Sequence, residues 1–243
     1  NISISGGRFT ENLFVVDGIG VNSRLDVSST NANHYIEGNA AASAQSLWVD
    51  SSLVGNIIVR DSNVSAEFGQ FTGGVVQIDT RAPSHEFGVT AHYGESGADF
   101  AQFVMSDKNR RALSGAAPEK PDYRKYRFGA SIDLPASDDL RFLIGYNQSY
   151  SRVKYARSAA YAQHGDYGQE SRNHNLMGKF EADLQADLRL SGQVTYSPYE
   201  SEFAHPTGFN NMVYLQGGGL SGSLKLEGGA AHDAKWKVEV SHA

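Results

Sequence analysis

Apolar and polar residues alternate with a period of two along most of the chain from Glu86 onward. Successive side chains of a β-strand point to opposite faces of the sheet, so this period predicts strands with one apolar face and one polar face. In YRFGASIDL, for example, apolar residues occupy the even positions from Tyr126 to Leu134. Leu143 is an exception, because it is apolar where the pattern expects a polar residue. Roughly seven such segments occur, at residues 87–93, 126–134, 140–146, 176–184, 188–195, 220–227 and 236–240.

The connections between these segments are long and short in turn. Long loops are expected at 97–122, 156–173 and 197–219, and short turns at 136–139, 185–187 and 228–233. This alternation is typical of an outer-membrane β-barrel, which has short periplasmic turns and long external loops. Tyrosines near the predicted strand ends agree with the aromatic girdles of such barrels. A soluble antiparallel sandwich remains the alternative, although its loop lengths need not alternate.

Residues 1–82 have a different pattern, which predicts a small mixed α/β body. A short strand at 13–16 ends in the turn Asp17-Gly18, and a polar, Ser/Asn-rich loop follows at 22–39. Residues 40–48 favour a short helix, and 51–60 return to strand, clearest at 56–60. A glycine-rich turn at 65–74 then leads into a strand at 75–80, and its glycines permit positive φ or close backbone approach.

Composition limits the possible functions further. The chain has 243 residues, of which 40% are hydrophobic, a net charge of -6 and no cysteine. No apolar run reaches the roughly 18 residues of a spanning helix, so insertion into a membrane would have to use strands. The absence of a basic stripe argues against nucleic acid as a partner. Because the chain begins with Asn1, inside a patterned segment, we expect a processed or partial chain.

No arrangement of residues indicates catalysis, a metal ion or a cofactor. The eight histidines have no metal-ligand spacing, and the sequence contains no G-x-S-x-G motif. Asp138 and Asp139 fall in a short turn, where aspartate is a common turn former. The basic segment 107–111 is either a solvated charge run or a contact for anionic groups such as lipopolysaccharide phosphates. We therefore predict a protein that is not an enzyme.

Charged residues in the predicted strands share the polar face. A charge that faces lipid at mid-depth costs several kcal/mol, so these side chains are expected to face the lumen of a barrel. Accordingly, Phe142→Arg is expected to impair assembly and Arg141→Ala to be tolerated. The predicted lumen-facing set is His92, Arg127, Asp133, Arg141, Lys179, Glu181, Arg189, Lys225 and Glu227.

The strand that ends in Asp17-Gly18-Ile19, the stretch VGNIIVRDSNVSAEFGQFTGGVVQIDTR and the amphipathic strands after it resemble a TonB-dependent outer-membrane receptor. The form SAEFG-x-x-TGG is similar to the Oar-like branch of that family. In the family, a globular plug fills a barrel of about 22 strands. The resemblance implies that residues 1–82 are the C-terminal part of the plug and 83–243 the first roughly seven strands of an antiparallel transmembrane β-barrel. The plug-motif residues that it implies are Asp17, Gly18, Glu67, Gly69, Gly73, Gly74 and Thr80.

The resemblance also implies a function. Such a receptor lies in the bacterial outer membrane, among lipid and lipopolysaccharide, and binds an external ligand. A TonB-type energy-transducing complex then acts through a region that is not in this chain. Two alternatives remain: a barrel with a structural, assembly or protein-export role, and, less favoured, an outer-membrane enzyme. Ligand contact is expected in the long loops, for which we name Arg110, Arg111, His164, Tyr167 and His205.

Overall fold

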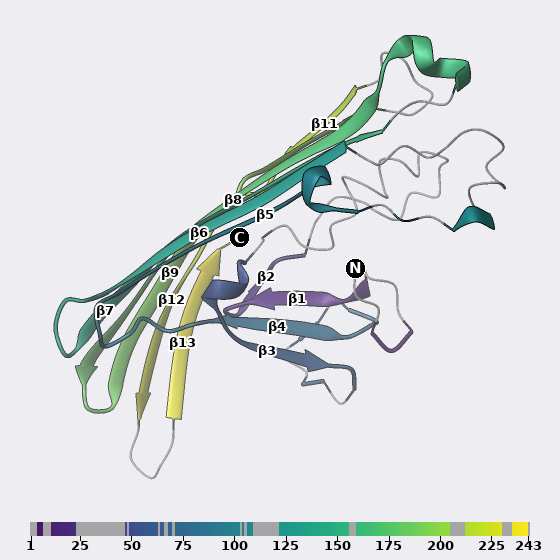
Figure 1. The fold of residues 1–243 in the computed structure, drawn as a ribbon. Helices are drawn as coiled ribbons and strands as arrows, with labels where there is room; N and C mark the ends of the chain where they lie inside the picture. Colours follow the sequence, from purple (N-terminus) through teal and green to yellow (C-terminus); the bar gives the residue numbers. More distant parts are fainter. Residues whose placement is uncertain are drawn as a thin grey trace.

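The described part of the chain forms two β-sheets, and the smaller one lies against one face of the larger (Figure 1). We call the smaller the plug sheet and the larger the wall sheet. The computed structural model describes residues 4–6, 11–22, 47, 49–62, 64–65, 68–69, 71–102, 104, 106–108, 122–155, 159–204, 212–229 and 235–242.

The plug sheet has four strands in the order β2-β1-β4-β3. Strand β4 lies in its middle, parallel to β1 and antiparallel to β3. A short 3-10 helix, η2 (Ser51–Leu53), precedes β3, and the sheet packs around Phe14, Val16 and Val76. The strands are β1 (Leu13–Val16), β2 (Ile19–Gly20), β3 (Val54–Arg60) and β4 (Val75–Thr80). The predicted strands at 13–16 and 75–80 are confirmed, whereas the predicted loop at 22–39 and helix at 40–48 lie almost wholly outside the described residues.

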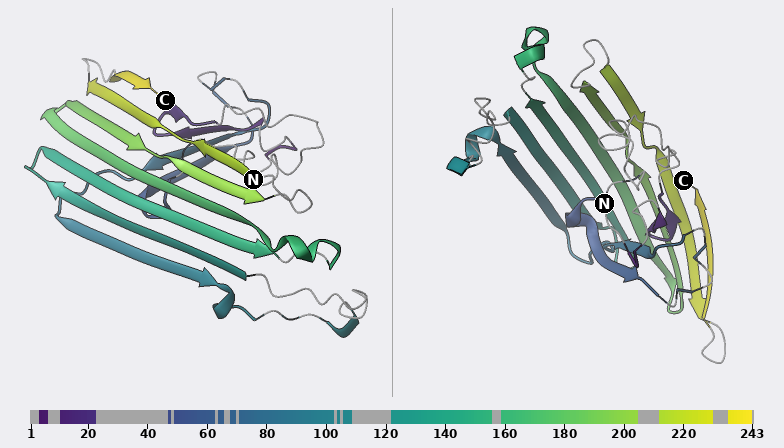
Figure 2. Two further views of the ribbon diagram at one scale, coloured as in Figure 1. Left: turned by 90° about the horizontal axis from the view of Figure 1, so that it is seen from above. Right: turned by 90° about the vertical axis from the view of Figure 1, so that its right-hand side faces the viewer.

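The wall sheet is an antiparallel array in which each strand pairs with its neighbours in the order β13-β12-β9-β8-β7-β6-β5 (Figure 2). These seven strands match the seven predicted segments, which confirms the mainly antiparallel fold. The strands are β5 (Gly88–Gly97), β6 (Asp122–Pro135), β7 (Leu140–Tyr155), β8 (Tyr167–Gln185), β9 (Leu188–Tyr196), β12 (Leu220–Gly229) and β13 (Lys235–His242).

Two of the predicted long loops are wrong in part. Strand β8 begins at Tyr167, so the connection after β7 covers only 156–166 and contains a 3-10 helix, η4 (Ala159–His164). The expected loop at 197–219 contains a hairpin of β10 (Tyr199–Ala204) and β11 (Met212–Gly217), in which β10 pairs with the first part of β8. The segment YGQESRN at the start of β8 is polar at almost every position, so it lacks the alternation that reveals a strand.

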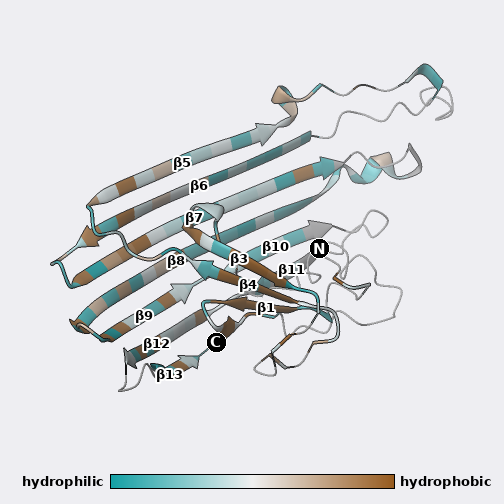
Figure 3. Ribbon diagram, turned by 90° about the horizontal axis from the view of Figure 1, so that it is seen from below, coloured by the Kyte–Doolittle hydropathy of each residue, from teal (hydrophilic) through white to brown (hydrophobic). Residues whose placement is uncertain are grey.

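The two faces of the wall sheet differ in polarity, and the plug sheet covers the polar one. Val89 is 64% exposed, Val194 54% and Val238 58% on the face away from the plug. On the opposite face Ser131, Asp133, Arg141 and Asn175 are buried. Coloured by hydropathy, β1, β3 and β4 of the plug sheet are largely apolar (Figure 3). No helix in the described part of the chain is long and apolar enough to cross a membrane.

Candidate functional site

The plug sheet contacts the wall sheet through a small apolar cluster. Leu53, at the end of η2, has no exposed surface and packs with Leu143 of β7 and Met177 of β8. Gly145 and Met177 are cross-strand partners, and a Cβ atom at Gly145 would lie 2.9 Å from Leu53 Cδ2. The missing side chain at Gly145 therefore makes room for Leu53. We call Leu53, Gly145, Leu143 and Met177 the apolar anchor.

A polar contact joins the plug to β8 beside this anchor. The turn residues Asp17 and Gly18 have φ of 47° and 84°, as the two central positions of a type I′ hairpin turn require. Thr80 donates to the Asp17 carboxylate twice, from its backbone N–H at 2.8 Å and from its hydroxyl at 2.6 Å. Lys179 of the wall donates to the Thr80 carbonyl at 3.1 Å and lies 3.5 Å from Asp17 Oδ1. Three residues predicted from different parts of the sequence thus meet at one place.

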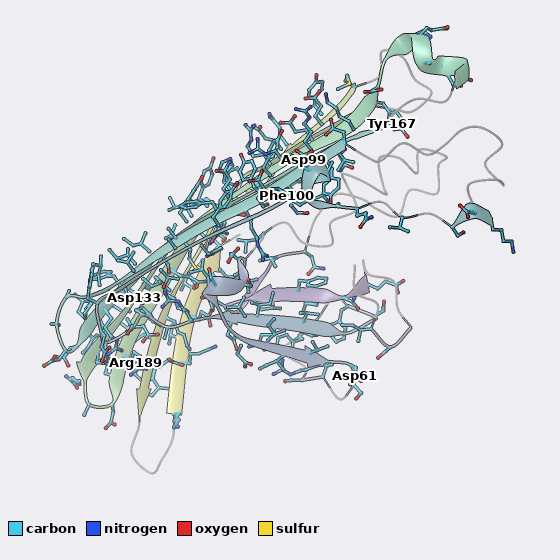
Figure 4. The ribbon with its side chains drawn as sticks, in the orientation of Figure 1. Asp61, Asp99, Phe100, Asp133, Tyr167 and Arg189 are labelled. Carbon is cyan, nitrogen blue, oxygen red and sulfur yellow. The ribbon has the colours of Figure 1, made fainter. Side chains whose placement is uncertain are left out.

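Arg81, which directly follows β4, makes a second polar contact with the wall. Its guanidinium binds Asp133 of β6 through two hydrogen bonds of 2.8 Å each. Asp133 also accepts the backbone N–H of Ser84 at 3.0 Å. A bidentate arginine–carboxylate pair fixes orientation as well as distance. The segment that links the two sheets is therefore held where it enters the wall (Figure 4).

A cavity of about 420 Å³ lies between the Asp17–Thr80 end of the plug and strands β8, β9, β12 and β13. It is lined by polar and charged side chains, among them five residues of the predicted sets on the wall and three on the plug. Those eight are Lys179, Glu181, Arg189, Lys225, Glu227, Asp17, Gly18 and Thr80.

Charged side chains of alternating sign form ion pairs across the wall strands beside this cavity. Arg141 lies 3.2 Å from Glu181 and 3.1 Å from Asp183, and Asp183 lies 2.6 Å from Arg189. Further along, Lys225 contacts Glu227 at 2.7 Å. Because each carboxylate has a basic neighbour, the polar face can be packed against the plug without isolated charges.

The surroundings of Arg141 change the effect that we expect from replacing it with alanine. Its side chain is only 3% exposed and lies between Glu181 and Asp183, with His85 Nδ1 3.2 Å away. Removing a buried partner leaves the remaining charges uncompensated. We therefore expect Arg141→Ala to be destabilising rather than tolerated.

The glycine-rich turn allows the chain to approach closely. At Gly73 and Gly74 a Cβ atom would collide with Asn12 and Ile4, and the Gly74 N–H donates to Asn12 Oδ1 at 3.1 Å. Gly69 has open space around it. Close approach, rather than positive φ, thus accounts for Gly73 and Gly74.

The other predicted residues are not brought into the cavity. His92 of β5 lies 3.5 Å from Asp50, and Arg127 of β6 lies beside Gly94. His164 ends η4 and Tyr167 begins β8, at the end of the wall with the longer connections. Glu67, Arg110, Arg111 and His205 lie outside the described residues. Within the part of the chain that the structure describes, no group of three or more His, Asp or Glu residues could hold a metal ion.

Sequence reasoning missed the apolar anchor and Arg81. A signal for the anchor was present, because Leu143 and Met177 are both apolar at positions of lumen parity. An apolar residue at such a position is expected where a second body covers the polar face. Arg81 gave no comparable signal, because its partner Asp133 is 52 residues further along the chain.

Comparisons with known proteins agree with this arrangement. No protein-family model matches the chain. The protein YddB of Escherichia coli K12 is 26% identical over 160 residues, which is 64% of this chain and 20% of that protein. The crystal structure of the outer membrane transporter YddB from Escherichia coli superposes with a TM-score of 0.75 at 20% identity, over 98% of this chain and 32% of that one.

The ferric enterobactin receptor of Pseudomonas aeruginosa matches with a TM-score of 0.63 and 16% identity, covering 98% of this chain and 34% of the receptor. The chain thus spans about a third of these solved structures. The chain therefore has the fold of part of these outer-membrane transporter and receptor structures.

Proposed function

We propose that this chain is the C-terminal part of the plug and the first roughly seven barrel strands of a TonB-dependent outer-membrane receptor, and that the whole receptor binds an external ligand and admits it past the plug. The observation that carries the proposal is the position of the plug sheet. It covers the polar face of an amphipathic strand array whose other face is apolar and exposed. A soluble sheet has no reason to present an apolar face to its surroundings, whereas a barrel wall presents one to lipid.

The contacts between plug and wall suggest how passage is controlled. The apolar anchor and the Lys179–Asp17 contact hold one side of the plug, and a charged cavity lies beside them. When the plug moves, water can take the place of each partner in such a buried polar contact, because both side chains are groups that water solvates. We infer that ligand passage requires the Lys179–Asp17 contact to open.

Energy for that movement is proposed to come from a TonB-type complex acting on a part of the whole protein outside this chain. Ligand contact is proposed at the end of the wall that carries the longer connections, where His164 and Tyr167 lie.

The test joins plug and wall covalently in the full-length protein. This chain contains no cysteine, so Asp17→Cys and Lys179→Cys add a unique thiol pair to it. A short bis-methanethiosulfonate reagent would link the two thiols, and a reductant would release them. Ligands are first screened by binding, beginning with ferric siderophores. Cells are then assayed for uptake of each ligand that binds.

We expect the cross-linked receptor to bind its ligand and to lose uptake, and the reductant to restore uptake. A protonophore should abolish uptake by the unlinked receptor. Each single-cysteine variant, treated with the same reagent, is the matched control. Uptake that persists after complete cross-linking would contradict the proposal, and uptake that is independent of the proton-motive force would favour a structural or export role instead.

A further inference from the structure

The plug is held against one half of the wall, strands β5 to β8. The apolar anchor joins it to β7 and β8, and Arg81 binds Asp133 of β6. At the edge of the wall, Asp50 of the plug lies 3.5 Å from His92 of β5. The Lys179 side chain of β8 makes the last of these contacts, next to the cavity. The plug is therefore attached along four adjacent strands.

The other half of the wall, strands β9, β12 and β13, faces the plug across the cavity of about 420 Å³. In the strand register Gln193 of β9 pairs with Ser223 of β12, and Ser191 pairs with Lys225. All four residues line the cavity. A polar cavity of this size has room for a chain of water molecules. On this side the lining is hydrophilic, whereas the attached side includes the apolar anchor.

The charges that line the cavity nearly balance. On β12 Lys225 lies 2.7 Å from Glu227, and on β13 Lys237 lies 2.9 Å from Glu239. A cleft lined by one sign of charge concentrates ions of the opposite sign, whereas paired charges do not. A polar solute can therefore enter this cavity without being retained. The basic lining residues are Lys179, Arg189, Lys225 and Lys237, and the acidic ones are Asp17, Asp79, Glu181, Glu227 and Glu239.

Gln193 provides independent support for a polar occupant of the cavity. Its side chain is 7% exposed, and within the described part of the chain its Oε1 has no hydrogen-bond partner. Buried acceptors in proteins are normally hydrogen-bonded. Because Gln193 lines the cavity, its donor is expected on the cavity side. A hydroxyl or amide group of a passing solute can supply that donor as well as water can.

We propose that the path past the plug opens along β9, β12 and β13, while the plug stays attached to β5 to β8. Gln193, Ser223 and Lys225 line this path, and it takes polar, hydrogen-bonding solutes. The inference rests on the proposed function, in which a ligand passes the plug. It adds the side of the plug on which passage takes place. Opening of the Lys179–Asp17 contact widens the cavity from its border with β8.

The experiment measures potassium chloride current through the full-length protein in a planar lipid bilayer. Urea is raised in steps until a current first appears, because urea weakens the packing that holds the plug. The test variant is Ser223→Cys, treated with a methanethiosulfonate that carries a biotin group. Thr90→Cys is the matched control, because Thr90 is exposed on β5 two residues from His92 and thus on the same lumen-facing side. Any cysteine outside this chain is first replaced by serine.

We expect the adduct at Ser223→Cys to reduce the first current at least twofold, and a reductant to restore it. The same adduct at Thr90→Cys should change the current by less than a fifth. A second measurement, the reversal potential in a salt gradient, needs no adduct. Lys225→Gln should raise the ratio of cation to anion permeability at least twofold, and Arg127→Gln of β6 should leave it unchanged.

Full modification of Ser223→Cys without a loss of current would overturn the proposed route, as would equal blocking by the two adducts. Either result would leave passage past the plug intact as a function. If no current appears at any urea concentration that leaves the barrel folded, passage past the plug is itself contradicted, and the route with it.

Discussion

Replacing Leu53 with alanine would show how much the apolar anchor contributes to holding the plug. The side chain has no exposed surface and fills the space between Leu143, Met177 and the vacant side of Gly145. A buried leucine replaced by alanine typically costs about 2–5 kcal/mol, because its transfer energy is lost and a cavity remains. Since this cluster is small, we expect about 2–4 kcal/mol, in the lower part of that range.

Hydrogen–deuterium exchange of the full-length protein would measure this loss. The plug sheet has four short strands, so its stability depends on the wall that it contacts. Losing about 2–4 kcal/mol should accelerate exchange of the β1 and β4 amides by about 30- to 700-fold, since each 1.4 kcal/mol is a factor of ten. The control is Leu176→Ala, which removes the same atoms from β8 on the outer face, where Leu176 is 48% exposed.

The reasoning would be refuted if exchange in β1 and β4 changed by less than threefold in Leu53→Ala. It would also fail if Leu176→Ala produced an equal acceleration, since the effect would then report general damage to β8. Gly145→Val offers an independent check from the wall side. Its added carbons would compete with Leu53 for one space, so it should accelerate plug exchange while leaving both anchor leucines in place.

Three further outcomes are expected. Arg81→Lys should fail to replace the bidentate contact with Asp133, and Arg81→Ala should cost about 1.5–3 kcal/mol, measured by thermal unfolding of the full-length protein. Gly18→Ala should destabilise the plug turn by about 1–2 kcal/mol, because φ is positive and the new Cβ would meet Glu239; faster amide exchange in β1 would reveal it. Phe142→Arg should weaken the heat-modifiable band on gels, since an arginine on the lipid-facing side of a strand destabilises a barrel by an amount that grows towards mid-depth; an unchanged band would contradict the assignment of faces.

The wall strands could be predicted from the sequence where one side of the strand meets an apolar environment. In β6 and β12 the alternation is regular, and the predicted segments lie within the observed strands. The first residues of β8 were missed because both faces of the strand are polar there, beyond the apolar band, so the sequence has the composition of a loop. The hairpin of β10 and β11 was missed because MVYLQG begins with four consecutive apolar residues and therefore lacks the period of two.

The contacts between plug and wall were predicted unevenly. Asp17 and Thr80 were identified from the turn and the exit strand, and Lys179 from its parity, but their meeting depends on how the two sheets are placed. That placement is set by packing at the apolar anchor, between residues that are 90 and 124 positions apart from Leu53 along the chain, at Leu143 and Met177. Patterns within one strand contain no information about such distant partners.

The parallel pairing of β1 with β4 has a consequence for the order of folding. Leu13 pairs with Val75 and Val16 with Ile78, so β1 obtains its central partner only after more than sixty further residues have been synthesised. Contacts between such distant residues form slowly, because the intervening loop must first be closed. β4 is also followed almost at once by β5 of the wall. The strand that completes the plug sheet therefore directly precedes the first wall strand in the chain, so the plug sheet cannot form without the segment that leads into the wall.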